Sequence, residues 1–455
     1  MATITSNNPA TYKDIKTFDL QTDDEISKVL DECQETWNSF RKMSISDRAT
    51  RMNKAAEILE ENKDRYAQTM VEEMGKTLSA AKSEVEKCAW VCRYYAEHAA
   101  EFLADEFIDS DAQKSMICYR PLGVVLAVMP WNYPFWQVFR FAAPALMAGN
   151  VGVLKHASNV PQSALNIQEV FELAGFPKFA FATILAKSGQ VKAILNNPIV
   201  QAATLTGSGP AGAAVASEAG KNIKHTVLEL GGSDPYVVLE DADLEWAAEQ
   251  CTESRLLNTG QSCIGAKRFI VVEEIYDDFL ERFTANMKSK KMGDPMTDVD
   301  LGPMAREDLR NEVHEQVEES VKAGATLHLG GEIPDQEGAY YPATILIDVK
   351  KGMPAYDDEI FGPVASVIRV RDEKHAIEVA NDTKFGLGAC VFTTDIKRGE
   401  RIAKDELEAG CCFVNHYVKS DPRLPFGGIK ESGYGRELSH LGMREFVNIK
   451  TIYIK

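Results

Sequence analysis

The sequence predicts an α/β protein built from two stretches of alternating strands and helices. Three observations lead to this prediction. Short apolar runs alternate with helix-like segments from about residue 123 onward, a second alternating stretch starts near residue 268, and a purely helical stretch precedes both. Because strands that alternate with helices of this length form βαβ units, we expect mainly parallel sheets.

The helical stretch covers residues 23–104. Apolar residues recur there at helical spacing, as in Ala55, Ile58 and Leu59, and proline is absent. The first alternating stretch follows it. Its strands are expected at 123–129, 151–154, 202–206, 226–230 and 236–239, and its helices near 161–175, 188–197 and 209–221.

The second alternating stretch predicts another α/β unit. Its strands are expected at 268–272, 325–329, 364–370 and 389–393, and its helices near 274–290, 306–323 and 373–382. The last ten residues (FVNIKTIYIK) have the pattern of an exposed strand. Since an exposed strand edge can pair with another chain, we expect at least a dimer.

Length, charge and cysteine usage restrict the function class. The chain has 455 residues, which suits two or three structural units, and its net charge of −18 disfavours nucleic acid as a partner. We find no membrane-spanning stretch and no signal peptide, so a cytoplasmic location is expected. The nine cysteines lack zinc spacing, which predicts reduced thiols and no bound metal.

Cys263 is the candidate nucleophile. It lies in the small, polar loop 258–265 (NTGQSCIG), where glycines on both sides let backbone N–H groups approach a reacting atom. Lys267 and Arg268 follow and would favour the thiolate. The local pattern alone favours an inert loop thiol over a reactive one.

Glu229 is the candidate base, because a glutamate inside an apolar strand run is costly unless it is used or paired. Burial would raise its pKa toward the range useful for proton abstraction. A second interpretation stays open. The segment 207–212 (GSGPAG) matches a dinucleotide fingerprint, and Glu229 follows at the distance of a ribose-binding acid. A surface position at the strand end is the third possibility.

With these residues in view, the chain resembles the aldehyde dehydrogenase superfamily. Seven segments carry the resemblance, in family order and over most of the chain: PWNYP (130–134), LKHAS (154–158), LTGS (205–208), LELGG (228–232), NTGQSC (258–263), EIFGPV (359–364) and PFGGIKESGYGRE (425–437). The resemblance implies a Rossmann-type dinucleotide-binding domain (1–101 and 122–230), an α/β catalytic domain (231–432) and a small β oligomerisation element (102–121 and 433–455). It also implies a homodimer or homotetramer.

The resemblance implies a covalent mechanism. The Cys263 thiolate would add to the aldehyde, and the Asn132 side-chain amide with the Cys263 backbone N–H would hold the oxyanion. After hydride transfer, Glu229 would activate the water that hydrolyses the thioester. The cofactor ligands implied are Trp131, Lys155, Ser158, Gly207, Ser208, Glu359 and Phe361.

Ser158 bears on the choice of dinucleotide. NAD-preferring relatives often carry glutamate there, which repels a 2′-phosphate, whereas serine removes that repulsion and can donate a hydrogen bond. We therefore expect NADP as the preferred cofactor, with NAD as the alternative. A serine that merely admits both dinucleotides would fit as well.

The substrate expected from the resemblance is succinate semialdehyde, because the chain is most similar to bacterial succinate-semialdehyde dehydrogenases. In that group an arginine and a serine at the positions of Arg140 and Ser420 receive the distal carboxylate. Trp136 would line the tunnel. One departure weakens the match: some members carry a second arginine where this chain has Leu257, with Arg255 two residues away.

Several alternatives stay open at this stage. Arg140 could form a structural ion pair instead of binding substrate, and another short or ω-carboxylate aldehyde, such as glutarate semialdehyde, could be the substrate. From other function classes, a non-oxidative thioester-handling enzyme would leave Lys155, Glu359 and Phe361 idle. A binding protein without catalysis conflicts with the complete set of Asn132, Glu229 and Cys263.

Overall fold

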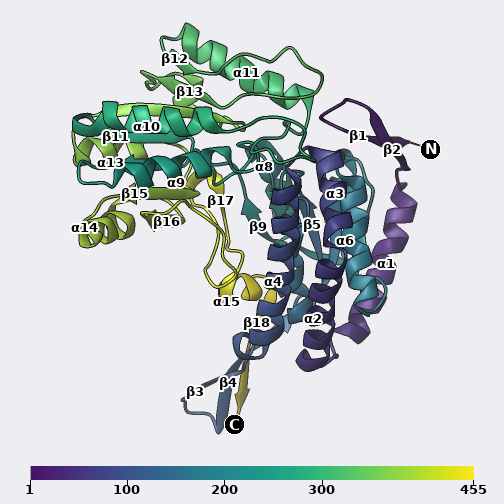
Figure 1. Cartoon of the computed structure of the whole chain (residues 1–455). Coiled ribbons are helices and arrows are strands. Elements are labelled where there is room, and N and C mark those ends of the chain that lie inside the picture. Colours follow the sequence, from purple (N-terminus) through teal and green to yellow (C-terminus); the bar gives the residue numbers. More distant parts are fainter. Residues whose placement is uncertain (1) are drawn as a thin grey trace.

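The computed structural model describes residues 2–455, and Figure 1 shows two α/β bodies and a small sheet that projects from them. The chain begins with an antiparallel hairpin of β1 (Thr3–Asn7) and β2 (Asp14–Asp19), which the sequence analysis did not predict. The helical stretch is confirmed: it forms α1 (Asp23–Phe40), α2 (Ile45–Glu61), α3 (Lys63–Met74) and α4 (Leu78–Phe102).

Local capping defines where these helices begin. The side chains of Thr22, Ser44 and Thr77 accept hydrogen bonds from the first turns of α1, α2 and α4. Each cap satisfies an amide that would otherwise lack a partner inside the helix. The four helices pack together and against the first sheet, which fixes the position of α4 beside the site described below.

The first sheet has six strands in the order β17-β9-β8-β5-β6-β7, and all of its neighbours are parallel except β17. Its strands are β5 (Val124–Met129), β6 (Val151–His156), β7 (Phe181–Thr183), β8 (Val200–Thr206), β9 (His225–Glu229) and β17 (Gly433–Tyr434). Its helices are α5 (Trp136–Ala148), α6 (Pro161–Leu173), the short η1 (Ser188–Gln190), α7 (Val191–Asn196) and α8 (Gly209–Lys221).

The second sheet has seven strands in the order β12-β13-β14-β11-β10-β15-β16, and only β12 is antiparallel to its neighbour. Its strands are β10 (Pro235–Val238), β11 (Arg268–Val272), β12 (Thr326–Leu329), β13 (Thr344–Ile347), β14 (Val364–Val370), β15 (Gly388–Phe392) and β16 (Cys411–Val414). Its helical elements are α9 (Leu244–Leu256), η2 (Glu273–Ile275), α10 (Tyr276–Ser289), α11 (Glu307–Lys322), α12 (Pro354–Asp357), α13 (Glu373–Asn381), α14 (Ile396–Arg401) and η3 (Ile402–Glu406).

One strand belongs to a different sheet than expected. The run at 236–239 was placed in the first alternating stretch, but β10 pairs with β11 and β15 in the second sheet. The reason is that β17 already occupies the outer edge of β9, through Gly433 and Tyr434. Parallel strands in both sheets otherwise confirm the predicted α/β class.

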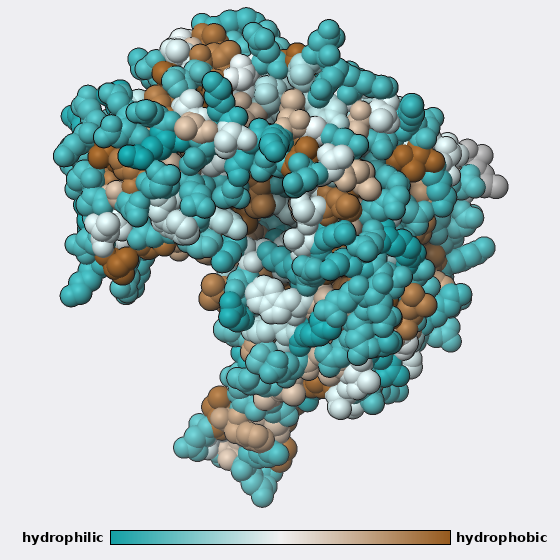
Figure 2. Space-filling view, viewed as in Figure 1, coloured by the Kyte–Doolittle hydropathy of each residue, from teal (hydrophilic) through white to brown (hydrophobic). Residues whose placement is uncertain are grey.

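A three-stranded antiparallel sheet projects from the body in the order β18-β4-β3, and the C-terminus lies on it (Figure 1). It contains β3 (Glu106–Ile108), β4 (Lys114–Pro121) and β18 (Val447–Ile454). The last of these, β18, follows η4 (Lys430–Ser432) and α15 (Ser439–Arg444) in the chain. Figure 2 shows hydrophobic residues on this projection. Phe107 of β3 and Ile449 of β18 are 68% and 63% exposed. The terminal strand was predicted, whereas the domain boundaries remain a prediction. β17 lies in the first sheet, although its residues fall inside the segment assigned to the oligomerisation element.

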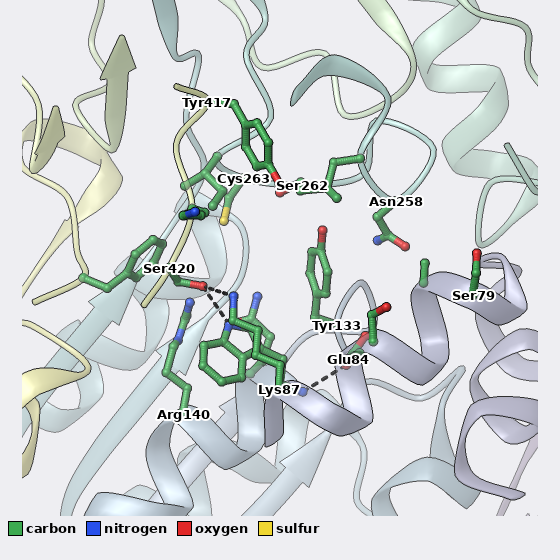
Figure 3. Close-up of a pocket in the computed structure, with 18 residues that line it drawn as sticks. Ser79, Glu84, Lys87, Tyr133, Arg140, Asn258, Ser262, Cys263, Tyr417 and Ser420 are labelled. Carbon is green, nitrogen blue, oxygen red and sulfur yellow. Dashed lines mark hydrogen bonds between the residues drawn. The ribbon is translucent and has the colours of Figure 1, made fainter. Parts of the chain in front are cut away.

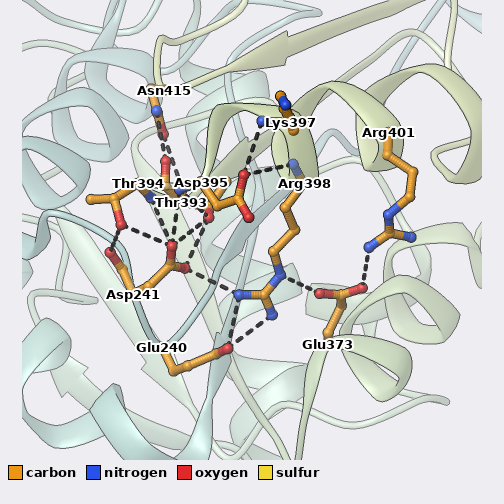
Figure 4. A network of polar contacts seen from close by, with 10 residues as sticks. All are labelled: Glu240, Asp241, Glu373, Thr393, Thr394, Asp395, Lys397, Arg398, Arg401 and Asn415. Atoms are coloured by element: carbon orange, nitrogen blue, oxygen red, sulfur yellow. Dashed lines mark hydrogen bonds and ion pairs between the residues drawn. The ribbon is translucent and has the colours of Figure 1, made fainter.

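A polar network ties the loop after β10 to α14 at one end of the second sheet (Figure 4). The carboxylate of Asp241 accepts hydrogen bonds from the hydroxyls of Thr393 and Thr394. Arg398 forms ion pairs with Glu240, Asp241 and Glu373. None of its residues lines the cavities described next. The network joins the chain after β10 to the chain after β15, two segments that are distant in the sequence.

Candidate active site

Cys263 lies in a tight loop between α9 and β11. Asn258, Thr259 and Gly260 all have positive φ angles, of 55°, 55° and 74°. A side chain on Gly260 would clash with the backbone of Gly362, so glycine is required there. The strained turn brings Cys263 to the surface of an internal cavity, where it is only partly buried.

Two basic residues, Lys267 and Arg255, stabilise this loop through hydrogen bonds to its backbone carbonyls. Lys267 donates hydrogen bonds from Nζ to the carbonyls of Ser262 (2.9 Å) and Cys263 (2.7 Å). The guanidinium of Arg255, which is fully buried, donates to the carbonyls of Ala266 and Gly260. Arg255 therefore supports the loop and does not line the cavity in front of Cys263.

The expectation that Arg268 favours the thiolate is wrong. Its guanidinium donates to the backbone carbonyls of Ser233, Val379 and Ala380 inside the second body. Successive residues of a strand point to opposite faces, so Lys267 and Arg268 cannot both face Cys263. Burial raises the pKa of the Cys263 thiol to about 12, whereas Arg140 and Lys267 act to lower that pKa.

Cys263 stands where two cavities meet. The tunnel cavity has a volume of about 440 Å³ (Figure 3). Cys263 lines it, and so do Trp136, Arg140, Leu257 and Ser420. The sheet-edge cavity, of about 260 Å³, lies at the carboxyl ends of β8 and β9. Only Cys263 and Gln137 line both, so the nucleophile candidate can face a ligand in either one.

Asn132 and Glu229 line the sheet-edge cavity with Cys263. The Asn132 side chain donates one hydrogen bond from Nδ2 to the Gln261 carbonyl (3.1 Å), and its backbone oxygen accepts one from Asn258 Nδ2 (2.8 Å). These contacts orient the amide and leave its second N–H without a partner among residues 2–455. The structure therefore brings all three predicted catalytic residues together.

Glu229 ends β9 with a side chain that is only 2% exposed. Neither of its carboxylate oxygens has a hydrogen-bond partner within the described chain. Burial, followed by the nearby Glu437 carboxyl, raises the pKa of Glu229 well above its ordinary value, although Arg140 and Arg436 oppose the shift. A carboxyl in this state can accept a proton from water once it is ionised.

Five of the predicted cofactor ligands line the sheet-edge cavity: Trp131, Gly207, Ser208, Glu359 and Phe361. The Glu359 carboxylate accepts a hydrogen bond from the Gly232 amide (2.9 Å) and lies 3.4 Å from Lys267 Nζ. A side chain on Gly231 would clash with Glu359. The rings of Trp131 and Phe361 pack edge to face at 5.8 Å.

Lys155 and Ser158 lie outside both cavities, at the carboxyl end of β6 and in the loop that follows it. Lys155 is 7% exposed and has no ion-pair partner among residues 2–455. Burial lowers the pKa of Lys155. The features fit a dinucleotide, because this unpaired cation and the start of α8 lie at the carboxyl edge of the same parallel sheet.

The tunnel cavity holds the predicted substrate residues Arg140, Ser420 and Trp136. Arg140 also forms an ion pair with Glu437. The contact expected from the alternative interpretation, in which Arg140 forms a structural ion pair, is therefore present. The ring of Phe426 lies 4.6 Å from the Arg140 guanidinium. Arg140 therefore borders the cavity and at the same time pairs with a buried carboxyl.

Sequence reasoning missed several residues of the tunnel cavity. Ser83 and Lys87 lie one helical turn apart on α4, on the face that borders the cavity. This spacing is visible in the sequence, but nothing in the sequence tells which face of α4 meets the tunnel. The other missed lining residues are Ser79, Ala80, Glu84, Tyr133, Gln137, Tyr417, Lys419 and Phe426.

The arrangement of a cysteine, an amide and a carboxyl around one cavity matches a known family. The model of the aldehyde dehydrogenase family matches residues 1–452. The chain belongs to the aldehyde dehydrogenase family. Two curated aldehyde dehydrogenases are 51% identical to it: a probable NADP(+) succinate-semialdehyde dehydrogenase of Synechocystis sp., over 452 residues, and NADP(+) succinate-semialdehyde dehydrogenase 1 of Mycobacterium tuberculosis, over 455. Each alignment covers 99% of both chains.

Solved structures agree with this aldehyde dehydrogenase fold. Succinic semialdehyde dehydrogenase from Streptococcus pyogenes, solved in complex with NADP+, superposes with a TM-score of 0.97, 39% identity and 99% coverage of each chain. An NADP-dependent enzyme of E. coli superposes with a TM-score of 0.97 and 33% identity, over 100% of this chain and 95% of that one. The predicted family, fold class and oxidoreductase class are confirmed.

Two kinds of feature are absent from residues 2–455: a membrane-spanning helix and a metal-binding cluster. No helix there has the length and apolar character needed to cross a bilayer. No group of three or more metal-binding side chains is gathered in that range.

Proposed function

We propose that this aldehyde dehydrogenase oxidises succinate semialdehyde to succinate with NADP+ as the hydride acceptor. The observation that carries the proposal is the position of Cys263, which lines both the tunnel cavity and the sheet-edge cavity. An aldehyde entering through the tunnel would reach the sulfur from one side, and a nicotinamide in the sheet-edge cavity would reach the adduct from the other.

The proposed chemistry starts with addition of the Cys263 thiolate to the aldehyde carbonyl. The free N–H of the Asn132 amide and the Cys263 backbone N–H stabilise the oxyanion that forms. When bound, the dinucleotide supplies the acceptor for the hydride that leaves this carbon. Glu229 then takes a proton from water, the water attacks the thioester carbonyl, and the carbon–sulfur bond breaks to release the acid and the Cys263 thiolate.

The preference for NADP+ rests on the relatives and on Ser158. The curated relatives are named as NADP(+) enzymes, and the S. pyogenes structure holds NADP+. Ser158 is exposed beside β6 and carries no charge that would repel a 2′-phosphate, while the nearby Lys155 is an unpaired cation. The same features admit NAD+ as a second cofactor.

The carboxylate-bearing substrate is supported by the charge of the tunnel. Arg140 and Ser420 border the cavity, although Leu257 stands where some relatives have a second arginine. Glutarate semialdehyde, one methylene longer, is the second candidate. A panel of succinate semialdehyde, glutarate semialdehyde and butanal with each dinucleotide tests the proposal through the absorbance of reduced nicotinamide. The highest kcat/KM is expected for succinate semialdehyde with NADP+. No reduction with any aldehyde would overturn the proposed activity.

Arg140→Leu tests the role of Arg140 in this proposal. The substitution should raise the KM for succinate semialdehyde far more than the KM for butanal, because only succinate semialdehyde has a carboxylate that Arg140 can bind. Arg140→Leu also leaves the Glu437 carboxyl without its partner, so the double variant Arg140→Leu/Glu437→Gln is the matched control. Equal effects on both aldehydes in the double variant would remove Arg140 from the binding site.

The assembly and location are part of the same proposal. The exposed edges of the projecting sheet, with Phe107 and Ile449 on it, suit pairing with other copies of this chain in a homodimer or homotetramer. A cytoplasmic location agrees with the nine free cysteines of the described chain. Light scattering and cell fractionation test these two points.

A further inference from the structure

We propose that Lys87 is the main cation that receives the distal carboxylate of the substrate in the tunnel cavity. This inference rests on the proposed function, because it assumes an aldehyde with a carboxylate at its far end. Lys87 lies on α4 and lines the tunnel cavity together with Arg140 and Ser420 (Figure 3). Lys87 is neither one of the predicted carboxylate-binding residues, Arg140 and Ser420, nor part of the family segments.

Lys87 is a cation without a counter-ion. No carboxylate lies within ion-pair distance of its Nζ in residues 2–455. The two acids nearest to it are already engaged. Glu84 pairs with Lys76 and accepts the amides of Phe135 and Trp136.

Asp421 is the other acid, and it is held by Arg423 through both of its oxygens. Lys87 is partly buried, and a charge shielded from water without a partner is costly, so its position suits an anion that arrives from the cavity. Burial lowers the pKa of Lys87 to about 8, and a bound carboxylate would raise it again.

Arg140 differs from Lys87 in this respect. Its guanidinium pairs with Glu437, and the side chains of the two residues are 2% and 6% exposed. Glu437 offsets part of the Arg140 charge, whereas no carboxylate of residues 2–455 pairs with Lys87. Lys87 therefore supplies an uncompensated positive charge beside Ser420, and it stands in for the arginine that is missing at Leu257.

Ser420 and Trp136 position the Lys87 ammonium. Lys87 Nζ donates a hydrogen bond to Ser420 Oγ (2.8 Å) and lies 4.3 Å from the centre of the Trp136 ring. The Trp136 indole N–H also donates to Ser420 Oγ (3.1 Å). With both lone pairs used, the Ser420 hydroxyl has only its proton to offer, so it becomes a donor to the same carboxylate.

The test compares Lys87→Met with Lys82→Met, a matched loss of charge on α4 at a lysine outside both cavities. For Lys87→Met we expect kcat/KM with succinate semialdehyde to fall about 30-fold or more, while kcat/KM with butanal changes little. Lys87→Arg should restore most of the preference, and Lys82→Met should lose little of it. Fluorescence measurements of dinucleotide binding by each variant check that the fold is intact.

Equal losses for both aldehydes, or no loss for either, would overturn the inference. A second readout separates it from the proposed function: inhibition of butanal oxidation by succinate, the product dianion. Lys87→Met should weaken this inhibition by a similar factor. If the wild-type enzyme does not prefer succinate semialdehyde, the proposed function fails. If it does, and Lys87→Met keeps both the preference and the succinate inhibition, only the role of Lys87 fails.

Discussion

Arg140 of α5 and Glu437, which follows β17, form an ion pair in which both side chains are almost completely shielded from solvent. The pair joins the helix after the PWNYP segment to the C-terminal part of the chain. It influences both candidate functional groups of the site, because Arg140 lowers the pKa of Cys263 and Glu437 raises the pKa of Glu229. Changes to either partner should therefore affect both stability and chemistry.

Glu437→Gln should destabilise the protein strongly. The substitution leaves the Arg140 guanidinium buried without a counter-charge, which costs about 3–5 kcal/mol in comparable buried pairs. Urea unfolding followed by tryptophan fluorescence measures the change. The control is Asp277→Asn, which breaks the exposed pair with Arg369 and should cost less than about 1 kcal/mol. Equal losses in the free energy of unfolding for the two variants would mean that Glu437 does not stabilise the buried charge of Arg140.

Cys263→Ala should abolish turnover and leave dinucleotide binding intact, because the covalent adduct needs the sulfur while the sheet-edge cavity has many other walls. Turnover is measured by nicotinamide reduction, and binding by calorimetry. Cys412→Ala, at another partly buried thiol, is the control and should retain activity. Retained oxidation in Cys263→Ala would refute the covalent route.

Glu229→Gln should separate the two halves of the reaction. Without a base for water, the thioester should accumulate, so we expect a burst of reduced cofactor followed by a steady rate reduced by about 10²-fold or more. Rapid mixing with substrate measures the burst. If the variant shows only weaker dinucleotide binding and a normal steady rate, Glu229 is a ribose ligand, as the fingerprint at 207–212 allows.

The pH dependence of turnover should reflect the raised pKa of Glu229. Burial and Glu437 disfavour its charged form, so Glu229 is neutral below its raised pKa and becomes a base only as pH increases. The hydrolysis-limited rate should therefore rise with pH. In Glu437→Gln the like charge is gone and Arg140 is freed, so this rise should occur at lower pH. An unchanged profile in steady-state kcat would contradict the coupling.

Ser158→Glu should turn the cofactor preference toward NAD+. The new carboxylate would repel the 2′-phosphate, so KM for NADP+ should rise about 10- to 100-fold while NAD+ is retained. Ser158→Gln adds the same bulk without charge and should keep NADP+ use. Steady-state kinetics with each dinucleotide decide the matter. A similar change in both variants would point to size rather than charge at this position.

The sequence by itself determined much of this protein. Strand and helix periodicity predicted most elements, because burial repeats every two residues in a strand and about every 3.6 in a helix. The motif around Cys263 and the segments holding Asn132, Glu229 and Glu359 pointed to an aldehyde dehydrogenase, because each is a short run of neighbouring residues. The structure places all four residues around one cavity.

Only the tertiary structure decided the charges of the tunnel. Arg140 and Glu437 are far apart in the sequence, and so are Lys87 and Ser420, yet each pair is in contact. Local patterns do not record which helix face meets a cavity or which acid neutralises which base. Those contacts arise when α4, α5 and the C-terminal segment pack together, and that packing leaves Arg140 paired and Lys87 without a counter-ion.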